Sequence, residues 1–226
     1  DIFDIRHYGC SYSKARSGFT TDKVKSVTTS QLDSNKYEND ANENFTSVKQ
    51  LIVDIDTQDN SDWMEICKSN TPKSLDEFLQ TAKLSRFKNS FNNFFENLSF
   101  SRIDNSSADE KRILFKKYGH EISVDSLSTG EKQIVFRGTH LLKNSNSING
   151  GIALIDEPEL SMHPIWQKKI LSYYRNLFTS EAEQVTQLII ATHSEYVLSS
   201  ALEDSSNVLV IVLSQSPSGI SQKRIT

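Results

Sequence analysis

The sequence predicts an α/β fold built on a parallel sheet. Two apolar segments, residues 151–156 and 187–192, each precede a segment with helical character, and a third, 207–214, follows the second helix. Apolar strands that alternate with helices are typical of a parallel sheet covered on both faces. We therefore expect three buried strands in one such sheet.

The composition is that of a globular chain. The 226 residues suffice for one large domain, with or without an insertion, and 36% are hydrophobic and 24% charged. The net charge of −4 creates no overall basic field, although a local patch could still bind DNA. No apolar run approaches the ~18 residues that span a bilayer, so we expect no membrane contact. Cys10 and Cys67 lack a partner motif, which favours reduced thiols in a cytoplasmic protein.

The first half of the chain is the more polar one. Residues 23–47 are mostly Ser, Thr, Asn, Asp, Glu and Lys, which predicts a long exposed loop. Residues 48–56 and 62–69 are expected to form two short helices. Apolar residues then recur at helical spacing through 74–98, so the phenylalanines of this stripe are expected in the core. Ser74 with Glu77 has the form of a capping box.

Shorter elements lead into the second half. Residues 99–104, 112–119 and 121–126 are expected to be strands, because apolar and polar residues alternate in them. Helices are expected over three further segments, which are 131–143, 164–178 and 194–202.

Two adjacent acids follow the first apolar segment. Asp156 and Glu157 come directly after the run 152–155, which lacks alternation and is expected to be buried on both faces. Open α/β sheets bind ligands at this carboxyl end of their strands. There an aspartate can hold Mg²⁺, and a glutamate can orient or deprotonate an attacking water. The residues alone leave open the alternative that both acids cap a turn in solvent.

A histidine follows the second apolar segment. His193 lies between Thr192 and Ser194, where it could contact a terminal phosphate or the attacking water. A lone histidine is more often a satisfied polar residue or a neighbour of a helix start. Its position one strand after Asp156 and Glu157 favours the functional interpretation.

The third motif begins a helix. In LSTGEKQIVF, residues 127–136, Ser128 and Glu131 are spaced as a capping box, and Gly130 permits close backbone approach. The simple interpretation is a well-capped helix. The other is a phosphate-binding helix N-terminus that reaches a triphosphate held by another subunit.

Together, in this order and with these separations, the motifs resemble those of the ABC-type ATPase superfamily. LSTGEKQ resembles its signature motif, IALIDE its Walker B strand, ELSMHP its D-loop and ATHS its switch-histidine loop. The sequence DEPELSMHP is similar to the corresponding segment in the non-transporter branch of this superfamily. That branch includes RecF-like and SMC-like ATPases of DNA maintenance and OLD-like prokaryotic ATPases of anti-phage defence. The resemblance covers roughly residues 99–213.

The resemblance implies a nucleotide-gated homodimer that holds ATP and Mg²⁺ between two ATPase cores. Asp156 would be the acid associated with Mg²⁺, and Glu157 the general base or water-orienting group. His193 would sense the γ-phosphate. Signature residues would reach the ATP of the partner subunit, and D-loop residues would lie at the dimer seam. These residues are Ser128, Gly130 and Gln133 from the signature, and Ser161, Met162 and His163 from the D-loop. A simpler role for His163 is to precede Pro164 at a helix start.

One part of the family's site has no counterpart here. A phosphate loop has the pattern G-x-x-x-x-G-K-[ST], because its backbone amides and lysine cradle the β- and γ-phosphates. None of the eight glycines is followed by lysine. Since the chain opens at Asp1 without methionine, we expect the loop to lie upstream. This piece of a longer ATPase would then be inactive alone.

The expected division has three parts. Residues 1–22 are a remnant of an N-terminal ATPase lobe, 23–98 a helical lid or insertion with a polar loop, and 99–226 the lobe with the signature, Walker B, D-loop and switch histidine. The expected fold class is thus the C-terminal portion of an α/β, P-loop-type ABC ATPase core with a helical, partly polar lid.

Three functional hypotheses follow. The leading one is an ATP-hydrolysing dimer in DNA metabolism or anti-phage defence, with DNA and a nuclease or effector protein as candidate partners. The second is a non-hydrolysing scaffold that recruits a nuclease or effector; the missing loop favours it and the surviving motifs oppose it. The third is a transporter nucleotide-binding subunit. The long polar segment and the sequence DEPELSMHP argue against it.

Overall fold

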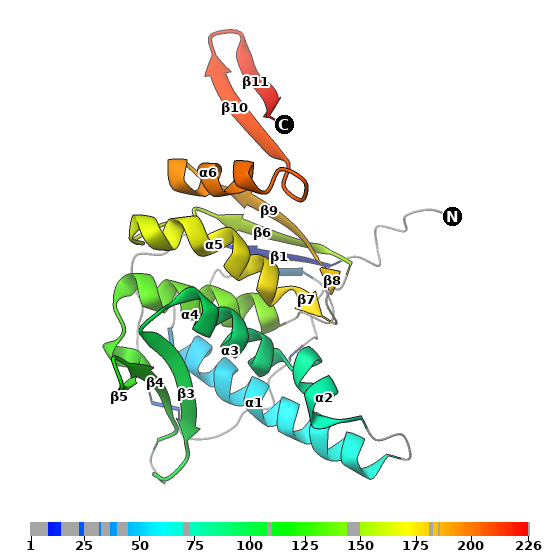
Figure 1. Cartoon of the computed structure of the whole chain (residues 1–226), viewed down its shortest axis with the longest axis vertical. Helices are drawn as coiled ribbons and strands as arrows, with labels where there is room; N and C mark the ends of the chain where they lie inside the picture. The colour runs from blue at the N-terminus through cyan, green and yellow to red at the C-terminus, as the bar shows by residue number, and fades with distance from the viewer. Residues whose placement is uncertain are drawn as a thin grey trace.

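A four-stranded parallel sheet organises the molecule (Figure 1). The strand order is β2-β1-β6-β9, with β1 at Cys10–Ser13, β2 at Tyr37–Asn39, β6 at Ile152–Asp156 and β9 at Gln187–Ala191. This confirms the predicted α/β class and the parallel sheet. The computed structural model describes residues 9–14, 23–24, 32, 37–39, 45–69, 73–107, 110–143, 150–180, 183–184 and 186–225.

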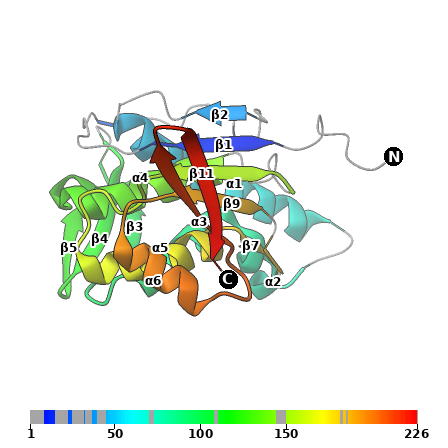
Figure 2. The same ribbon diagram turned by 90° about the horizontal axis from the view of Figure 1, so that it is seen from above.

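Among the described residues, only one face of the sheet is well covered, so the prediction of strands buried on both faces is wrong. In β6, Ala153 and Ile155 are buried, whereas Ile152 and Leu154 are only half-buried. In β9, Ile189 is 48% exposed. The helices α4, at Thr129–Lys143, and α5, at Pro164–Leu177, lie on the same side of the strands, as the two views in Figure 1 and Figure 2 show together. The apolar residues of β6 therefore alternate between a packed and a more open face.

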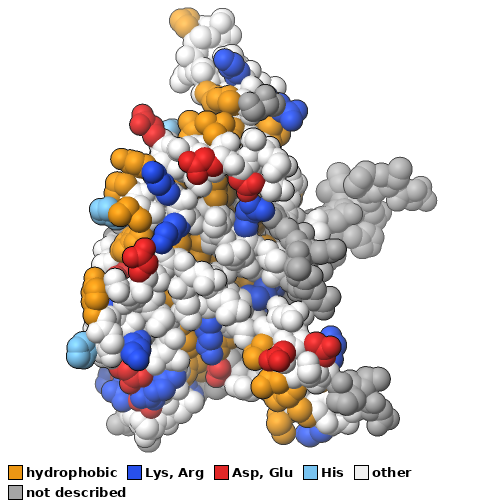
Figure 3. All heavy atoms as spheres, in the orientation of Figure 1, with side chains coloured by type: hydrophobic (Ala, Val, Ile, Leu, Met, Phe, Trp, Pro, Cys, Tyr) orange, Lys and Arg blue, Asp and Glu red, His pale blue; other side chains and the backbone are white. Residues whose placement is uncertain are grey.

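The third expected strand does not join this sheet. β10, at Val210–Ser216, pairs antiparallel with β11, at Gly219–Ile225, as a separate two-stranded hairpin. The hairpin projects beyond α6, at Glu195–Glu203, and hydrophobic side chains gather over it in Figure 3. Leu213 is 68% exposed and Ile220 77% exposed. Burial of this apolar segment was therefore predicted wrongly as well.

One long helix replaces the two short helices expected after the polar segment. α1 runs without a break over Phe45–Lys68. Its polar middle is held by side chains that bond one turn away: the hydroxyl of Thr57 donates to the carbonyl of Val53, that of Ser61 donates to the carbonyl of Thr57, and the Gln58 amide donates to Asp62. In the same stretch, the Asp59 carboxylate accepts hydrogen bonds from the N–H groups of Lys83 and Leu84, so a tertiary contact also holds this part of the helix.

Most of the polar segment 23–47, expected as an exposed loop, lies outside the described residues. Its described part departs from that expectation. Val24 is 2% exposed and bridges Lys111, residues 37–39 form β2, and α1 begins at Phe45.

The phenylalanine-rich segment forms α2, at Leu75–Thr81, and α3, at Lys83–Phe94. The capping box of Ser74 and Glu77 is confirmed, since each side chain accepts a hydrogen bond from the other residue's backbone N–H. The two helices are separated at Ala82, which has the extended ψ of 130°. The predicted core phenylalanines are buried, whereas Leu75 and Leu79 are exposed. The buried set is Phe78, Phe87, Phe91, Phe94 and Phe95.

α1 and α3 pack directly on the helices next to the sheet. α3 lies against both α4 and α5, and α1 lies against α4. The predicted boundary at residue 98 falls at the beginning of β3, and the three-part division stays a prediction. No helix in the described part of the chain is long and apolar enough to cross a membrane.

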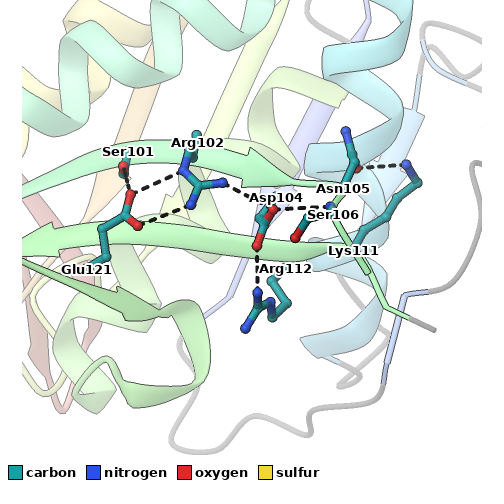
Figure 4. Close-up of polar contacts among 8 residues, drawn as sticks. All are labelled: Ser101, Arg102, Asp104, Asn105, Ser106, Lys111, Arg112 and Glu121. Carbon is teal, nitrogen blue, oxygen red and sulfur yellow. Dashed lines mark hydrogen bonds and ion pairs between the residues drawn. The ribbon is translucent and has the colours of Figure 1, made fainter. Parts of the chain in front are cut away.

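A three-stranded antiparallel sheet precedes α4. It consists of β3, β4 and β5, at Leu98–Asp104, Arg112–Lys117 and His120–Ser123. This agrees with the predicted strands except at residues 124–126, which form a 3-10 helix instead of the end of the third strand. A register shift in β3 between Phe100 and Arg102 lets Ser101 and Arg102 both bond to Glu121 (Figure 4).

The carboxylate of Asp104 lies at the centre of this network. It accepts a hydrogen bond from Arg112 at 2.6 Å and pairs with Arg102 at 3.2 Å. Hydrogen bonds from Ser106, followed by that from Arg112, hold the pKa of Asp104 well below its usual range.

Asp104 is expected to make the fold acid-sensitive. Because its pKa is lower in the folded chain than in the unfolded one, its contribution to stability is complete above about pH 5. That contribution is lost as the pH falls below the unfolded value of about 4. Urea unfolding between about pH 5 and pH 2.5 should give a shallower loss of unfolding free energy in Asp104→Asn than in the wild type. Glu195→Gln, at an exposed acid, is the control. Identical pH dependence in Asp104→Asn and wild type would contradict this assignment.

Candidate ATP-hydrolysing site

The two adjacent acids lie where β6 ends. Oδ2 of Asp156 accepts a long hydrogen bond, 3.5 Å, from the hydroxyl of Tyr12 on the neighbouring strand β1. Glu157 has a positive φ of 42°, which is rare for a residue with a side chain. Its N–H donates to the carbonyl of Ala191 at 2.9 Å, so the ends of β6 and β9 are held together. Such strained backbone is concentrated at functional sites.

The switch histidine, His193, lies close to Glu157, the second of these acids. Nε2 of His193 lies 4.0 Å from Oε1 of Glu157, although the two residues are 36 positions apart in the sequence. The parallel register, which pairs Asp156 with Ala191, brings the following loops to one edge of the sheet. The side chains of His193 and Glu157 are 91% and 41% exposed, so both are accessible to a ligand. The structure therefore brings together the acids and the histidine that the sequence singled out.

The signature segment forms the capping box expected from its spacing. The N–H of Ser128 donates to Glu131 at 2.8 Å, and the N–H of Glu131 lies 3.4 Å from the Ser128 hydroxyl. Lys117 on β4 pairs with the buried Glu131 carboxylate at 2.8 Å. The beginning of α4 is thus held by both local and tertiary contacts.

The signature glycine packs against the D-loop of the same chain. A Cβ atom at Gly130 would lie only 2.6 Å from the backbone oxygen of Ser161, so a side chain there would require backbone movement. Ser161 itself has a positive φ of 62°. His163 caps α5 by accepting the N–H of Ile165 on Nδ1, which confirms its simpler role. Met162 is buried.

The three residues assigned to the partner's ATP differ in exposure. Ser128 is exposed, whereas Gly130 is buried beneath the D-loop. Gln133 is completely buried, so its side chain offers no surface to a second subunit in this conformation. Of these three residues, Ser128 alone is exposed.

The sequence analysis gave no role to Arg137, which is fully buried in α4. Its Nη1 donates to the carbonyl of Asp156 at 2.8 Å and its Nη2 to the carbonyl of Lys14 at 2.9 Å. The guanidinium therefore joins the signature helix to the ends of β6 and β1. A buried charge needs such partners. The sequence did contain a signal for this role, since Arg137 is an arginine within the apolar stretch of a predicted helix.

Asp156 is the residue best placed for a metal. Mg²⁺ keeps several waters and takes one or two carboxylates together with substrate phosphates. A single half-buried carboxylate at a strand end fits that donor set. Within the described ranges, no group of three or more His, Cys, Asp or Glu residues forms a metal cluster.

Fold and motifs together define an ABC-type ATPase domain. Residues 12–199 match the family described as "AAA domain, putative AbiEii toxin, Type IV TA system", and the chain belongs to that family. The chain is 33% identical over 102 residues to the retron Vc95 probable ATPase of Vibrio cholerae serotype O1 biovar El Tor. It is 35% identical over 109 residues to the retron Ec83 probable ATPase of Escherichia coli.

These matches cover 41% and 44% of this chain but only 19% of each relative. Among solved structures, an SMC head bound to the C-terminal winged-helix domain of ScpA matches with a TM-score of 0.50 and 14% identity. That match covers 78% of this chain and 50% of the SMC chain, and it shows the shared fold.

Proposed function

We propose that this chain supplies the hydrolytic residues of an ATPase that acts as a nucleotide-gated dimer. The observation that carries the proposal is the meeting of Glu157 and His193, 4.0 Å apart, beside Asp156 at the carboxyl edge of the sheet. Glu157 orients or deprotonates the attacking water, and His193 contacts the γ-phosphate. A carboxylate and an imidazole on separate loops can hold water and phosphate in line.

Asp156 holds Mg²⁺ in this proposal. The ion supplies charge neutralisation at the β- and γ-phosphates when it is bound. Asp156 lies at the strand end, Tyr12 hydrogen bonds to one of its oxygens, and Arg137 fixes its carbonyl. The carboxylate is thereby oriented before nucleotide arrives, which lowers the entropic cost of binding.

The signature segment acts on ATP bound by a second copy. Ser128 is exposed at the beginning of α4, where the helix dipole favours a phosphate. Ser161 and His163, both exposed, are assigned to the seam between the copies. Gly130 and Gln133 then support the contact from within the chain, since both are buried.

The biological setting proposed is anti-phage defence or DNA metabolism. The two relatives named as retron probable ATPases support the first of these. DNA and a nuclease or effector protein are the proposed partners. The matched segment spans 19% of each relative, so these partners belong to the proposal for the whole protein.

The test is MgATP hydrolysis by the full-length protein, with molar mass followed by light scattering. Turnover together with an ATP-dependent rise from monomer to dimer is the expected result. A non-hydrolysing scaffold would form the dimer without releasing phosphate, and that outcome would overturn the proposal.

A further inference from the structure

Glu159 is the first residue of the D-loop segment ELSMHP and lies in the turn that follows β6. Its Oε1 accepts a hydrogen bond from the backbone N–H of His193 at 3.0 Å, across 34 residues of sequence. The turn and the switch-histidine loop are therefore joined by a carboxylate that the proposed chemistry does not use. Hydrogen bonds to a charged acceptor are the stronger kind in proteins.

The position of His193 depends on such contacts because its loop has little regular structure. Residues 192–194 lie between the end of β9 and the beginning of α6. The Ser194 hydroxyl caps α6 by accepting the N–H groups of Tyr196 and Val197, which fixes the loop on one side. Glu159 fixes the backbone at His193 itself. The imidazole, which is 91% exposed, can then keep its place near Glu157 without packing of its own.

The second oxygen of the Glu159 carboxylate lies in the interior. Its Oε2 is buried and has no hydrogen-bond partner within the described part of the chain. Burial raises the pKa of Tyr174 on α5, the neighbouring Arg137 guanidinium lowers it, and the Glu159 carboxylate raises it further. These influences locate Glu159, Tyr174 and Arg137 in one buried region. Arg137 also bonds to the carbonyl of Asp156 at the end of β6. The region therefore reaches from α4 to the end of β6 and, through Glu159, to the switch-histidine loop.

We propose that Glu159 is a positioning residue. Through its hydrogen bond from the His193 N–H, it keeps the His193 side chain close to that of Glu157. The inference rests on the proposed function for its effect on turnover, but the contact itself exists in the chain without nucleotide. Glu159 touches no reacting atom. Its removal releases the switch-histidine loop and leaves Glu157, Asp156 and the signature helix in place.

The contact is tested by amide hydrogen exchange at His193 in this chain. Glu159→Ala should raise the exchange rate of that amide by about tenfold or more. Glu159→Gln keeps an oxygen acceptor and should lie between this variant and the wild type. Glu195→Ala, at an exposed acid two residues beyond His193, should leave the rate unchanged. An unchanged His193 amide in Glu159→Ala, in a chain that melts at the wild-type temperature, would overturn the proposal.

The effect on turnover is tested in the full-length protein by a double-mutant cycle. Glu159→Ala should lower kcat by about tenfold with little change in KM, and should cause no further loss in a His193→Ala background. Equal losses in both backgrounds would show that Glu159 does not act through His193, and would overturn the proposal. Absence of turnover in the wild type would refute the proposed function instead, and the exchange measurement would still decide the role of Glu159.

Discussion

Glu157→Gln is expected to abolish nearly all ATP turnover in the full-length protein, with a loss of about 100-fold or more in kcat. General-base groups contribute about 10²- to 10⁴-fold to rates, and glutamine cannot accept the proton of the attacking water. The substitution preserves side-chain size, and the backbone N–H of residue 157 still bonds to the carbonyl of Ala191. ATP binding should therefore persist. Steady-state phosphate release and equilibrium binding of labelled ATP measure the two quantities.

The matched control is Glu195→Gln. Glu195 is an exposed acid just beyond the switch-histidine loop, and its neutralisation removes one negative charge from the same region. Its turnover should stay within about twofold of the wild type, because the charge of an exposed side chain is solvated and contributes little. Turnover by Glu157→Gln at the wild-type rate would contradict the role given to this acid.

The largest expected effect on stability is that of Gly138→Ala. A Cβ atom at Gly138 would lie 2.1 Å from the hydroxyl oxygen of Tyr173, which is 1% exposed and donates to the carbonyl of Ile134 at 2.8 Å. Overpacking of a core costs about 1–3 kcal/mol, and loss of a buried hydrogen bond adds about 1–3 kcal/mol. We therefore expect a loss of about 2–6 kcal/mol in the free energy of unfolding, measured with urea.

The cause can be isolated by removing the clashing atom. Tyr173→Phe deletes the hydroxyl, so the double variant Gly138→Ala with Tyr173→Phe should be more stable than the sum of the single losses predicts. The ring of Phe87, 3.2 Å from the same Cβ position, limits the rescue. Simple additivity would show that the clash with Tyr173 is not the source of the loss.

The features predicted correctly from the sequence follow either from the spacing of nearby residues or from a general rule of parallel sheets. The capping boxes at Ser74 and Ser128 depend on side chains three positions apart, and both formed. The meeting of Glu157 with His193 followed from one general property of parallel sheets, that the carboxyl ends of neighbouring strands share an edge. The phenylalanine core followed from helical periodicity.

The errors arose where distant segments decide the outcome. The segment of β10 is as apolar as that of β9, and its pairing with β11 rather than the main sheet depends on tertiary context. The polar middle of α1 favours a break by propensity, but Asp59 in it accepts hydrogen bonds from the backbone N–H groups of Lys83 and Leu84, which are distant in sequence. Arg137 is buried because carbonyl groups of Lys14 and Asp156 meet it, and neither is near it in sequence.

The most direct measurement is an experimental structure of full-length Glu157→Gln with MgATP. The account predicts that the γ-phosphate lies within hydrogen-bonding distance of the His193 imidazole, with Mg²⁺ linked to Asp156 directly or through water. A triphosphate bound elsewhere, or an imidazole turned away from it, would contradict the account that these strand ends form the hydrolytic site.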